Sequence, residues 1–356
     1  MLHVPDALDV LVPSALAGTV LLRAGAARAA VTACPARAVR LLGTAAAAAT
    51  LAAATAVVAV VVVLLARLPV VSAWGRWSTA ALPEPRVSWV WSVPVALALL
   101  ATSVALVRHV VLALRQLWAA DTLGRALGAS RTSPGWVVVE DPRPDAFALP
   151  AFPLPRRLRA RGSATARAGS TGRVVVSHGM LRALTPDQQR VLLEHERSHL
   201  EHRHHLWVQL GELVAVVNPL LSGVPGWVRD AAERQADLDA AERVGDRTLT
   251  AQAIAAAALA RSRTPPAPAR GRPGLHATGG DVARRVEFLL RTGTRGPSGR
   301  GSVVVLWAVV GLSLLTGAGT LYSLGDRLQQ ARVESVTQVS DTTADGGTTA
   351  PGPAGR

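Results

Sequence analysis

Long runs of apolar residues separate the charged segments of this chain, and they predict helices that cross a membrane. Residues 41–66 are rich in Ala, Val and Leu and carry no charge, and residues 87–107 and 301–325 form two further uncharged runs. About 20 consecutive apolar residues cross the hydrocarbon core of a bilayer, so each run is long enough to span it. Trp89 and Trp91, at the start of the second run, are typical of a membrane interface.

A shorter apolar segment near the N-terminus predicts another span, at about residues 4–22. Only 13 uncharged residues separate Asp9 from Arg23, so a helix lying in the membrane interface is the alternative. No positively charged region precedes the segment, which argues against a signal peptide. We therefore predict four spans in all.

Between the third and fourth spans, shorter patterns predict a soluble α+β domain. The segments "GWVVVEDP" and "GRVVVSHGM" are β-branched runs bounded by Gly and Pro, which is typical of strands. A basic, Gly/Ser-rich loop is expected at residues 156–173 and a Pro/Gly-rich linker at residues 262–280. The predicted organisation is a membrane region at residues 1–112, a soluble domain at 113–300, the fourth span at 301–325 and a disordered extracytoplasmic tail at 326–356.

The formal net charge of +14 comes entirely from arginine, and its placement predicts the orientation of the chain. Arginines flank the spans on two segments, 23–40 and 108–300, and cytoplasmic loops are enriched in such residues. We expect a multi-pass plasma-membrane protein whose soluble domain is cytoplasmic. Nucleic-acid binding would also suit this charge, but no recognition-helix pattern is present and no direct nucleic-acid partner is expected. The single cysteine, Cys34, excludes a cysteine-based zinc site.

Five of the nine histidines lie within "VLLEHERSHLEHRHH", residues 191–205. Thr185 and Gln188 form a capping box around Pro186, so a helix should begin here and continue to the neighbourhood of Gly211. His195, Glu196 and His199 form an HExxH motif. Residues four apart on a helix lie on one face, which lets two imidazoles share a zinc ion while the glutamate acts as general base on water.

A zinc site needs a third protein ligand, and the sequence offers two routes to it. His205 follows His199 by six residues, as in metzincins, but Gly is needed where this chain has His202, and on a continuous helix His205 is too distant. His202, His204 and His205 are therefore interpreted as surface residues or substrate contacts. A downstream helix places Glu233 and Asp237 on one face, as third ligand and as hydrogen-bond partner of a ligand imidazole. Asp230, Asp239 and Glu242 remain alternatives for the ligand.

The stretch from Leu184 to Leu221, followed by "ERQAD" at residues 233–237, resembles BlaR/MecR-type membrane zinc peptidases, in particular short forms without a penicillin-binding sensor domain. That family is related to HtpX-type peptidases. The resemblance covers roughly residues 90–325. It implies a zincin-like cytoplasmic domain and one Zn²⁺ per chain held by His195, His199 and Glu233. It also implies Glu196 as catalytic base and Asp237 as support.

The chain departs from the family pattern in two places. Related peptidases often carry Asn before "AF", where this chain has Asp145, a candidate substrate contact. Many zincins stabilise the oxyanion with Tyr, but the only tyrosine, Tyr322, lies in the last apolar run. His202 and Arg229 are the candidates for that role. Zincins hold extended substrates along an edge strand, and "VVVSH" at residues 174–178 is the candidate strand.

These patterns together predict an integral-membrane zinc endopeptidase that cleaves a cytosolic protein, with a BlaI/CopY-type repressor as the substrate that the resemblance suggests. An HtpX-like quality-control protease and a catalytically inactive metal-binding sensor are the alternatives. The presence of Glu196 argues against the sensor, because metal binding alone does not need this carboxylate.

Overall fold

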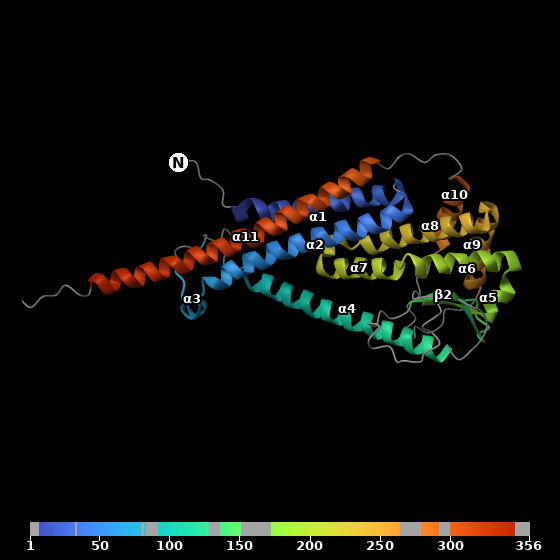
Figure 1. Cartoon of the computed structure of the whole chain (residues 1–356), viewed down its shortest axis with the longest axis horizontal. Coiled ribbons are helices and arrows are strands. Elements are labelled where there is room, and N and C mark those ends of the chain that lie inside the picture. The colour runs from blue at the N-terminus through green and yellow to red at the C-terminus, as the bar shows by residue number, and fades with distance from the viewer. Residues whose placement is uncertain are drawn as a thin grey trace, which may run out of the picture. The chain divides into compact units, whose positions relative to one another are not determined.

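The structure of the chain is a computed structural model, and it is mainly helical (Figure 1). It describes residues 7–32, 34–79, 82, 92–127, 136–150, 172–263, 279–291 and 300–345. The chain divides into two compact units. The first comprises Met1–Leu21, Ala48–Val104 and Val309–Arg356, and the second comprises Leu22–Ala47 and Ala105–Ala308.

The first unit is built from apolar helices that pack through small side chains. Ala15, Ala52 and Ala56 form a buried cluster, and a Cβ atom at Gly317 would lie 3.6 Å from Ala52 Cα. Close approach through such residues is typical of helices that associate in a bilayer. The helices that contribute to this unit, four of them continuing into the second, are α1 (Ala7–Thr32), α2 (Pro35–Ala66), α3 (Pro69–Gly75), α4 (Ser92–Leu127) and α11 (Arg300–Asp345).

Three helical segments among the described residues are long and apolar enough to cross a membrane: Pro35–Ala66, Leu97–Gln116 and Val303–Glu334. They overlap the second, third and fourth predicted spans. Large apolar side chains on them face outward: Leu97 is 61% exposed and Leu315 is 73% exposed. Exposed apolar surface on long helices suggests that the protein is associated with a membrane.

Two predictions for the membrane region, the first span and the disordered tail, are not confirmed. The first predicted span falls mostly on α1, which is not among the three segments, so the count of four spans stays a prediction. The tail expected to be disordered from residue 326 is helical as far as Asp345, because α11 continues 20 residues beyond the predicted span without a break. The remainder of the tail lies outside the described residues.

A three-stranded sheet of order β1-β3-β2 organises the second unit. Strand β1 (Trp136–Val139) pairs parallel with β3 (Gly172–Ser177), and β2 (Ala146–Pro150) pairs antiparallel with it. The structure confirms the two predicted strands, while β2 was not predicted. The prediction that residues 174–178 form an edge strand is wrong, because β3 is hydrogen-bonded on both sides and His178 already begins a helix.

One face of the sheet supports the helix that carries the HExxH motif. Alternate residues of β3, Val174 and Val176, pack in one buried cluster with Leu192 and Leu200 of that helix. This alternation is the strand period of two, and it fixes which helix face turns toward the sheet. The helices of this unit are α5 (His178–Ala183), α6 (Pro186–Glu201), α7 (His204–Val217), η5 (Pro219–Leu221), α8 (Val224–Val244), α9 (Arg247–Ser262) and α10 (Gly279–Arg291).

Helix α6 begins as predicted and ends earlier than predicted. The Thr185 side chain accepts a hydrogen bond from Gln188 N, and the Gln188 side chain accepts one from Thr185 N, so the capping box is confirmed. The continuous helix expected as far as Gly211 is wrong, because α6 ends at Glu201 and α7 starts at His204. Arg203 adopts the left-handed conformation with φ 51°, which breaks the helical hydrogen-bond ladder. Most of the basic loop and most of the linker predicted from composition lie outside the described residues, and the last two residues of the predicted loop, Gly172 and Arg173, begin β3.

Candidate metal centre

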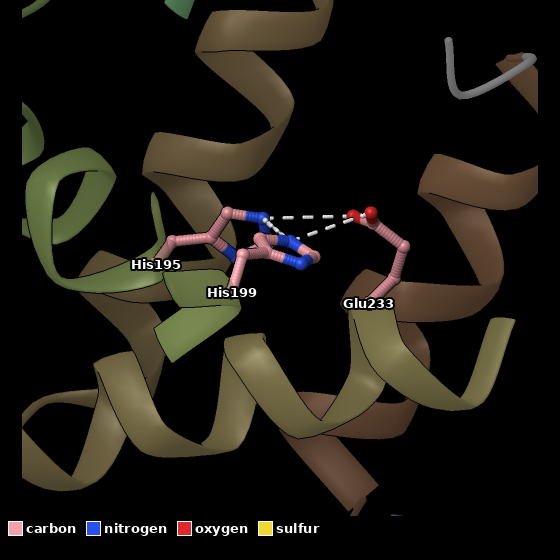
Figure 2. A group of neighbouring side chains, drawn as sticks. All are labelled: His195, His199 and Glu233. Carbon is pink, nitrogen blue, oxygen red and sulfur yellow. Dashed lines mark hydrogen bonds and ion pairs between the residues drawn. The ribbon is translucent and has the colours of Figure 1, made fainter. Parts of the chain in front are cut away.

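Helices α6 and α8 bring three candidate ligands together. His195 Nε2 and His199 Nε2 are 3.2 Å apart. Glu233 Oε2 lies 3.5 Å from His195 Nε2, and Glu233 Oε1 lies 3.5 Å from His199 Nε2. Figure 2 shows both rings, from α6, and the carboxylate, from α8, directed at the same space. The ligand atoms lie within 4.8 Å of one another, so this group could hold a metal ion.

The spacing of these atoms fits a tetrahedral zinc ion. Zinc–nitrogen and zinc–oxygen bonds are about 2.0–2.2 Å long, which places two tetrahedral ligand atoms about 3.3–3.5 Å apart. The three distances of 3.2, 3.5 and 3.5 Å match this spacing. All three residues are nearly buried, and two imidazoles with one carboxylate are a common catalytic zinc set that leaves a fourth position for water or substrate.

A network of charged side chains contacts His195 at Nδ1. His195 Nδ1 lies 3.0 Å from Asp237 Oδ1, and Asp237 is fully buried. Arg285 of α10 donates to Asp237 Oδ1 at 2.6 Å and to Oδ2 at 2.7 Å, and it pairs with Glu233 Oε2 at 2.8 Å. Burial would raise the pKa values of Glu233 and Asp237, but Arg285 and the histidines hold both below their usual range. Both carboxylates are therefore ionised.

The protonation of the two histidines differs because their surroundings differ. Burial alone would lower the pKa of His195, but Asp237 and Glu233 outweigh it and raise this pKa to about 9. Burial lowers the pKa of His199 to about 4, although Glu233 opposes the shift. A proton shared by the pair therefore resides on His195, and a metal ion bound there would displace it.

A neutral chain of hydrogen bonds supports His199. His199 Nδ1 lies 2.9 Å from His204 Nδ1, and His204 Nε2 lies 3.1 Å from Gln235 Oε1. All three side chains are buried, and His204 is 1% exposed. Burial lowers the pKa of His204 to about 3. The interpretation of His204 as a surface residue is therefore wrong, because the turn at Arg203 directs its ring inward against α6 and α8.

Glu196 is buried beside the same group of ligands. Burial raises the pKa of its carboxyl group, while the charges of His195 and Arg261 and a backbone hydrogen bond from Ala148 of β2 oppose the shift. A carboxylate with a raised pKa is a stronger base than an exposed one. The contact with Ala148 also places β2, an edge strand of the described sheet, next to Glu196.

The three candidate substrate or transition-state contacts, His202, Arg229 and Asp145, have partners of their own. His202 Nε2 lies 2.9 Å from Asp239 Oδ2, an oxygen that also accepts a hydrogen bond from Ser198 Oγ at 2.6 Å. Arg229 pairs with Glu212 of α7 at 2.8 Å. Asp145 precedes β2, and its backbone N–H donates to Ser177 Oγ at 2.9 Å. Their roles in substrate or transition-state binding stay predictions.

Sequence reasoning missed Arg285, His204 and Gln235. Gln235 lies two residues before Asp237 in "ERQAD", but a neutral amide gives no metal-site signal. Arg285 lies 48 residues beyond Asp237, past a linker, and one arginine among many carries no spacing cue. Arg284, Arg285 and Glu287 lie close together on α10, and which of them turns inward depends on how α10 packs.

Residues 119–219 match the family model described as peptidase family M48. The match includes His195, Glu196 and His199 and ends before Glu233 and Asp237. No curated protein and no solved structure matches the chain in the corresponding comparisons. The match supports the M48 metallopeptidase family, whose members are metal-dependent, and with the three apolar helices it suggests a membrane-associated metallopeptidase.

Proposed function

We propose that this protein is an integral-membrane, zinc-dependent endopeptidase with His195, His199 and Glu233 as the zinc ligands. The convergence of their three ligand atoms at tetrahedral spacing, next to a buried glutamate, is the observation that carries the proposal. The match of residues 119–219 to a peptidase family supports the reaction class. Zinc is preferred because imidazole and carboxylate suit it and the spacing fits its bond lengths.

Several residues of the chain have separate roles in the proposed peptide hydrolysis. Bound zinc would supply Lewis-acid chemistry, polarising the scissile carbonyl and lowering the pKa of water. Glu196 takes a proton from the attacking water and returns it to the leaving amine. Asp237 and Arg285 orient His195 and Glu233, and the burial of the site excludes bulk water. The oxyanion donor is assigned to His202 or Arg229, as the sequence suggested.

An extended substrate would pair with β2 rather than β3. Strand β2 lies at an edge of the described sheet, and Ala148 in it contacts Glu196. A peptide that hydrogen-bonds along this edge would bring a backbone carbonyl toward the ligand group, as in other β-strand additions. Strand β2 therefore takes the place of "VVVSH" as the proposed substrate-binding strand, because a peptide adds to a sheet at an edge strand.

The substrate is proposed to be a cytosolic protein, with a BlaI/CopY-type repressor as the first candidate, through the resemblance to BlaR/MecR-type peptidases. The flanking arginines support a cytoplasmic catalytic domain in a multi-pass plasma-membrane protein with four spans. An HtpX-like quality-control protease and an inactive metal sensor are the second candidates. The buried Glu196 beside the ligand group disfavours the sensor, because a metal-binding site gains nothing from an additional buried acid.

Zinc content and peptidase activity of the full chain in detergent test the proposal together. Wild type should hold about one zinc per chain by mass spectrometry and cleave fluorescent casein. His195→Ala and Glu233→Gln should lose the metal. Glu196→Gln should keep it and lose activity at least about 100-fold, since general-base catalysis contributes 10²–10⁴-fold.

The matched control is Glu194→Gln, which lies on the same helix and pairs with Arg243 rather than with the ligand group. This variant should keep both zinc and activity. Absence of zinc from wild type, or zinc unaffected by His195→Ala, would rule out the peptidase. Zinc retained in wild type without cleavage of casein, of the repressor or of a misfolded membrane protein would favour the sensor. Cleavage of a purified repressor but not of a misfolded membrane protein would separate the first two candidates.

A further inference from the structure

We infer that His204 and Gln235 are positioning residues that fix the tautomer and ring orientation of His199, so that its Nε2 lone pair faces the metal. The inference rests on the proposed function, because it concerns a ligand of the proposed zinc site. It assigns a role to two buried side chains that the peptidase mechanism does not itself require.

The direction of each hydrogen bond follows from the last acceptor in the chain. Gln235 Oε1 can only accept, so His204 Nε2, 3.1 Å away, must carry a hydrogen and donate it. A doubly protonated His204 would place an unpaired charge between a neutral amide and a neutral ring, at a position that is 1% exposed, and such burial is costly. His204 is therefore neutral, and its Nδ1 is an acceptor.

The same logic then assigns the proton of His199. Its Nδ1 lies 2.9 Å from His204 Nδ1, and because the latter accepts, His199 Nδ1–H must donate. A neutral imidazole with its hydrogen on Nδ1 has its lone pair on Nε2. That is the nitrogen 3.2 Å from His195 Nε2 and 3.5 Å from Glu233 Oε1. The chain from Gln235 to His199 thus leaves the correct nitrogen free for the metal.

The backbone of the α6–α7 turn makes this contact geometrically available. On a continuous helix, His204 would follow His199 by five residues and point to a different face. The left-handed Arg203 ends α6, and His204 becomes the first residue of α7. The rings of His199 and His204 meet nearly perpendicularly, with centroids 4.9 Å apart, which suits a hydrogen bond made in the plane of each ring.

Two substitutions remove the chain of hydrogen bonds from different helices. His204→Phe keeps the volume of the ring but leaves His199 Nδ1–H without an acceptor, and Gln235→Leu removes the terminal acceptor. His204→Asp is the conservative variant, because a carboxylate can accept directly from His199. His205→Asn is the matched control, since His205 is adjacent in sequence and makes none of these contacts.

Zinc affinity of the full chain, measured by competition with a chromophoric chelator, is the first readout. Loss of such a supporting partner weakens metal binding about 10–100-fold. We expect this loss in His204→Phe and Gln235→Leu, substantial recovery in His204→Asp, and wild-type affinity in His205→Asn. The visible spectrum of the cobalt-substituted protein is the second readout, and its bands should shift in the two weakened variants because the orientation of one imidazole changes.

Unchanged zinc affinity and cobalt spectrum in both His204→Phe and Gln235→Leu would overturn the inference while leaving the zinc site intact. Absence of zinc binding by wild type would instead overturn the proposed function. Gln235→Leu does not alter α7, so it carries the test alone if His204→Phe does not fold, with folding judged by circular dichroism. Equal weakening in His205→Asn would also count against the inference, because it would indicate a general effect of α7.

Discussion

His195 and His199 both face Glu233 with Nε2, but the side chains that contact their Nδ1 atoms differ in charge. His195 contacts the carboxylate of Asp237, which pairs with the guanidinium of Arg285, and we call this the charged side of the site. His199 contacts the imidazole of His204, which contacts the amide of Gln235, and we call this the neutral side of the site because it carries no formal charge. If His195 and His199 bind a metal, the charged partners of His195 would make it more basic and so a stronger ligand, while the neutral partners of His199 would fix its orientation without burying further charge.

The difference also indicates which helix supports each candidate ligand. His195 and Glu233 depend on α10, which supplies Arg285 after the linker. His199 Nδ1 is instead supported by His204 of α7 and, through it, by Gln235 of α8, and these helices lie nearer to α6 in the chain. Damage to α10 should therefore affect one side of the site, and damage to the α6–α7 turn should affect the other.

Replacing Arg285 should have the largest effect on the free energy of unfolding, because it removes the guanidinium of the charged side. Arg285→Leu leaves the buried carboxylates Glu233 and Asp237 without their cation, and removing one partner of a buried pair costs about 3–5 kcal/mol. Denaturant unfolding of the chelator-treated protein should show this loss, and added zinc should recover part of it by restoring positive charge. Arg284→Leu, on the exposed side of α10, is the control and should be close to wild type.

The stability of the metal-free protein should depend on pH with opposite slopes from the two histidines. The pKa of His195 is raised to about 9, so its stabilisation is complete below pH 6.5 and is lost as pH rises toward 9. The pKa of His199 is lowered to about 4, so stability is lost as pH falls from 6.5 toward 4. Unfolding free energies with chelator present should peak near pH 6.5. His195 should account for up to about 3–4 kcal/mol of the alkaline decline and His199 for up to about 3–4 kcal/mol of the acid decline, to which His204 adds.

Asp237→Asn sharpens this test, because it removes the main cause of the raised pKa. The alkaline decline should shrink while the acid decline remains. A stability curve that still falls from pH 6.5 to 9 by the wild-type amount would contradict the role given to Asp237.

Asp237→Asn should also weaken zinc binding by about 10–100-fold, the range observed for partners of ligand histidines. The matched control is Asp239→Asn on the same helix, because Asp239 binds Ser198 and His202 rather than a candidate ligand. Chelator competition should place Asp239→Asn within about threefold of wild type. Equal losses in the two variants would mean that α8 packing, and not the contact with His195, governs affinity.

The smallest predicted effect concerns the turn that serves the neutral side. Arg203 adopts a left-handed conformation that costs a non-glycine residue roughly 1–2 kcal/mol. Arg203→Gly should therefore stabilise the protein by up to about 1 kcal/mol, with zinc affinity unchanged, as measured by thermal unfolding and chelator competition. Arg197→Gly, inside α6, should destabilise by about 1 kcal/mol. Destabilisation by both would show that the turn is not strained.

The sequence predicted local features well, but it predicted poorly which elements pair or pack with one another. The capping box of α6 and the strands β1 and β3 were predicted because each depends on neighbouring residues and short periodicities. Strand β2 was missed because "AFALP" is short and ends in proline, so only pairing with β3 makes it a strand. The edge assignment of β3 was wrong for the same reason, since strand order is set by contacts between distant segments.

By itself, the sequence determined the HExxH motif on a helix, the apolar runs of α2, α4 and α11, and Glu233 with Asp237 on one face of a second helix. These follow from spacing along a single element, which the helical period converts directly into geometry. Only the tertiary structure decided that α6 ends at Glu201, that His204 turns inward to His199, and that Arg285 joins Glu233 to Asp237. Such contacts join elements whose relative placement depends on core packing, and no local pattern encodes it.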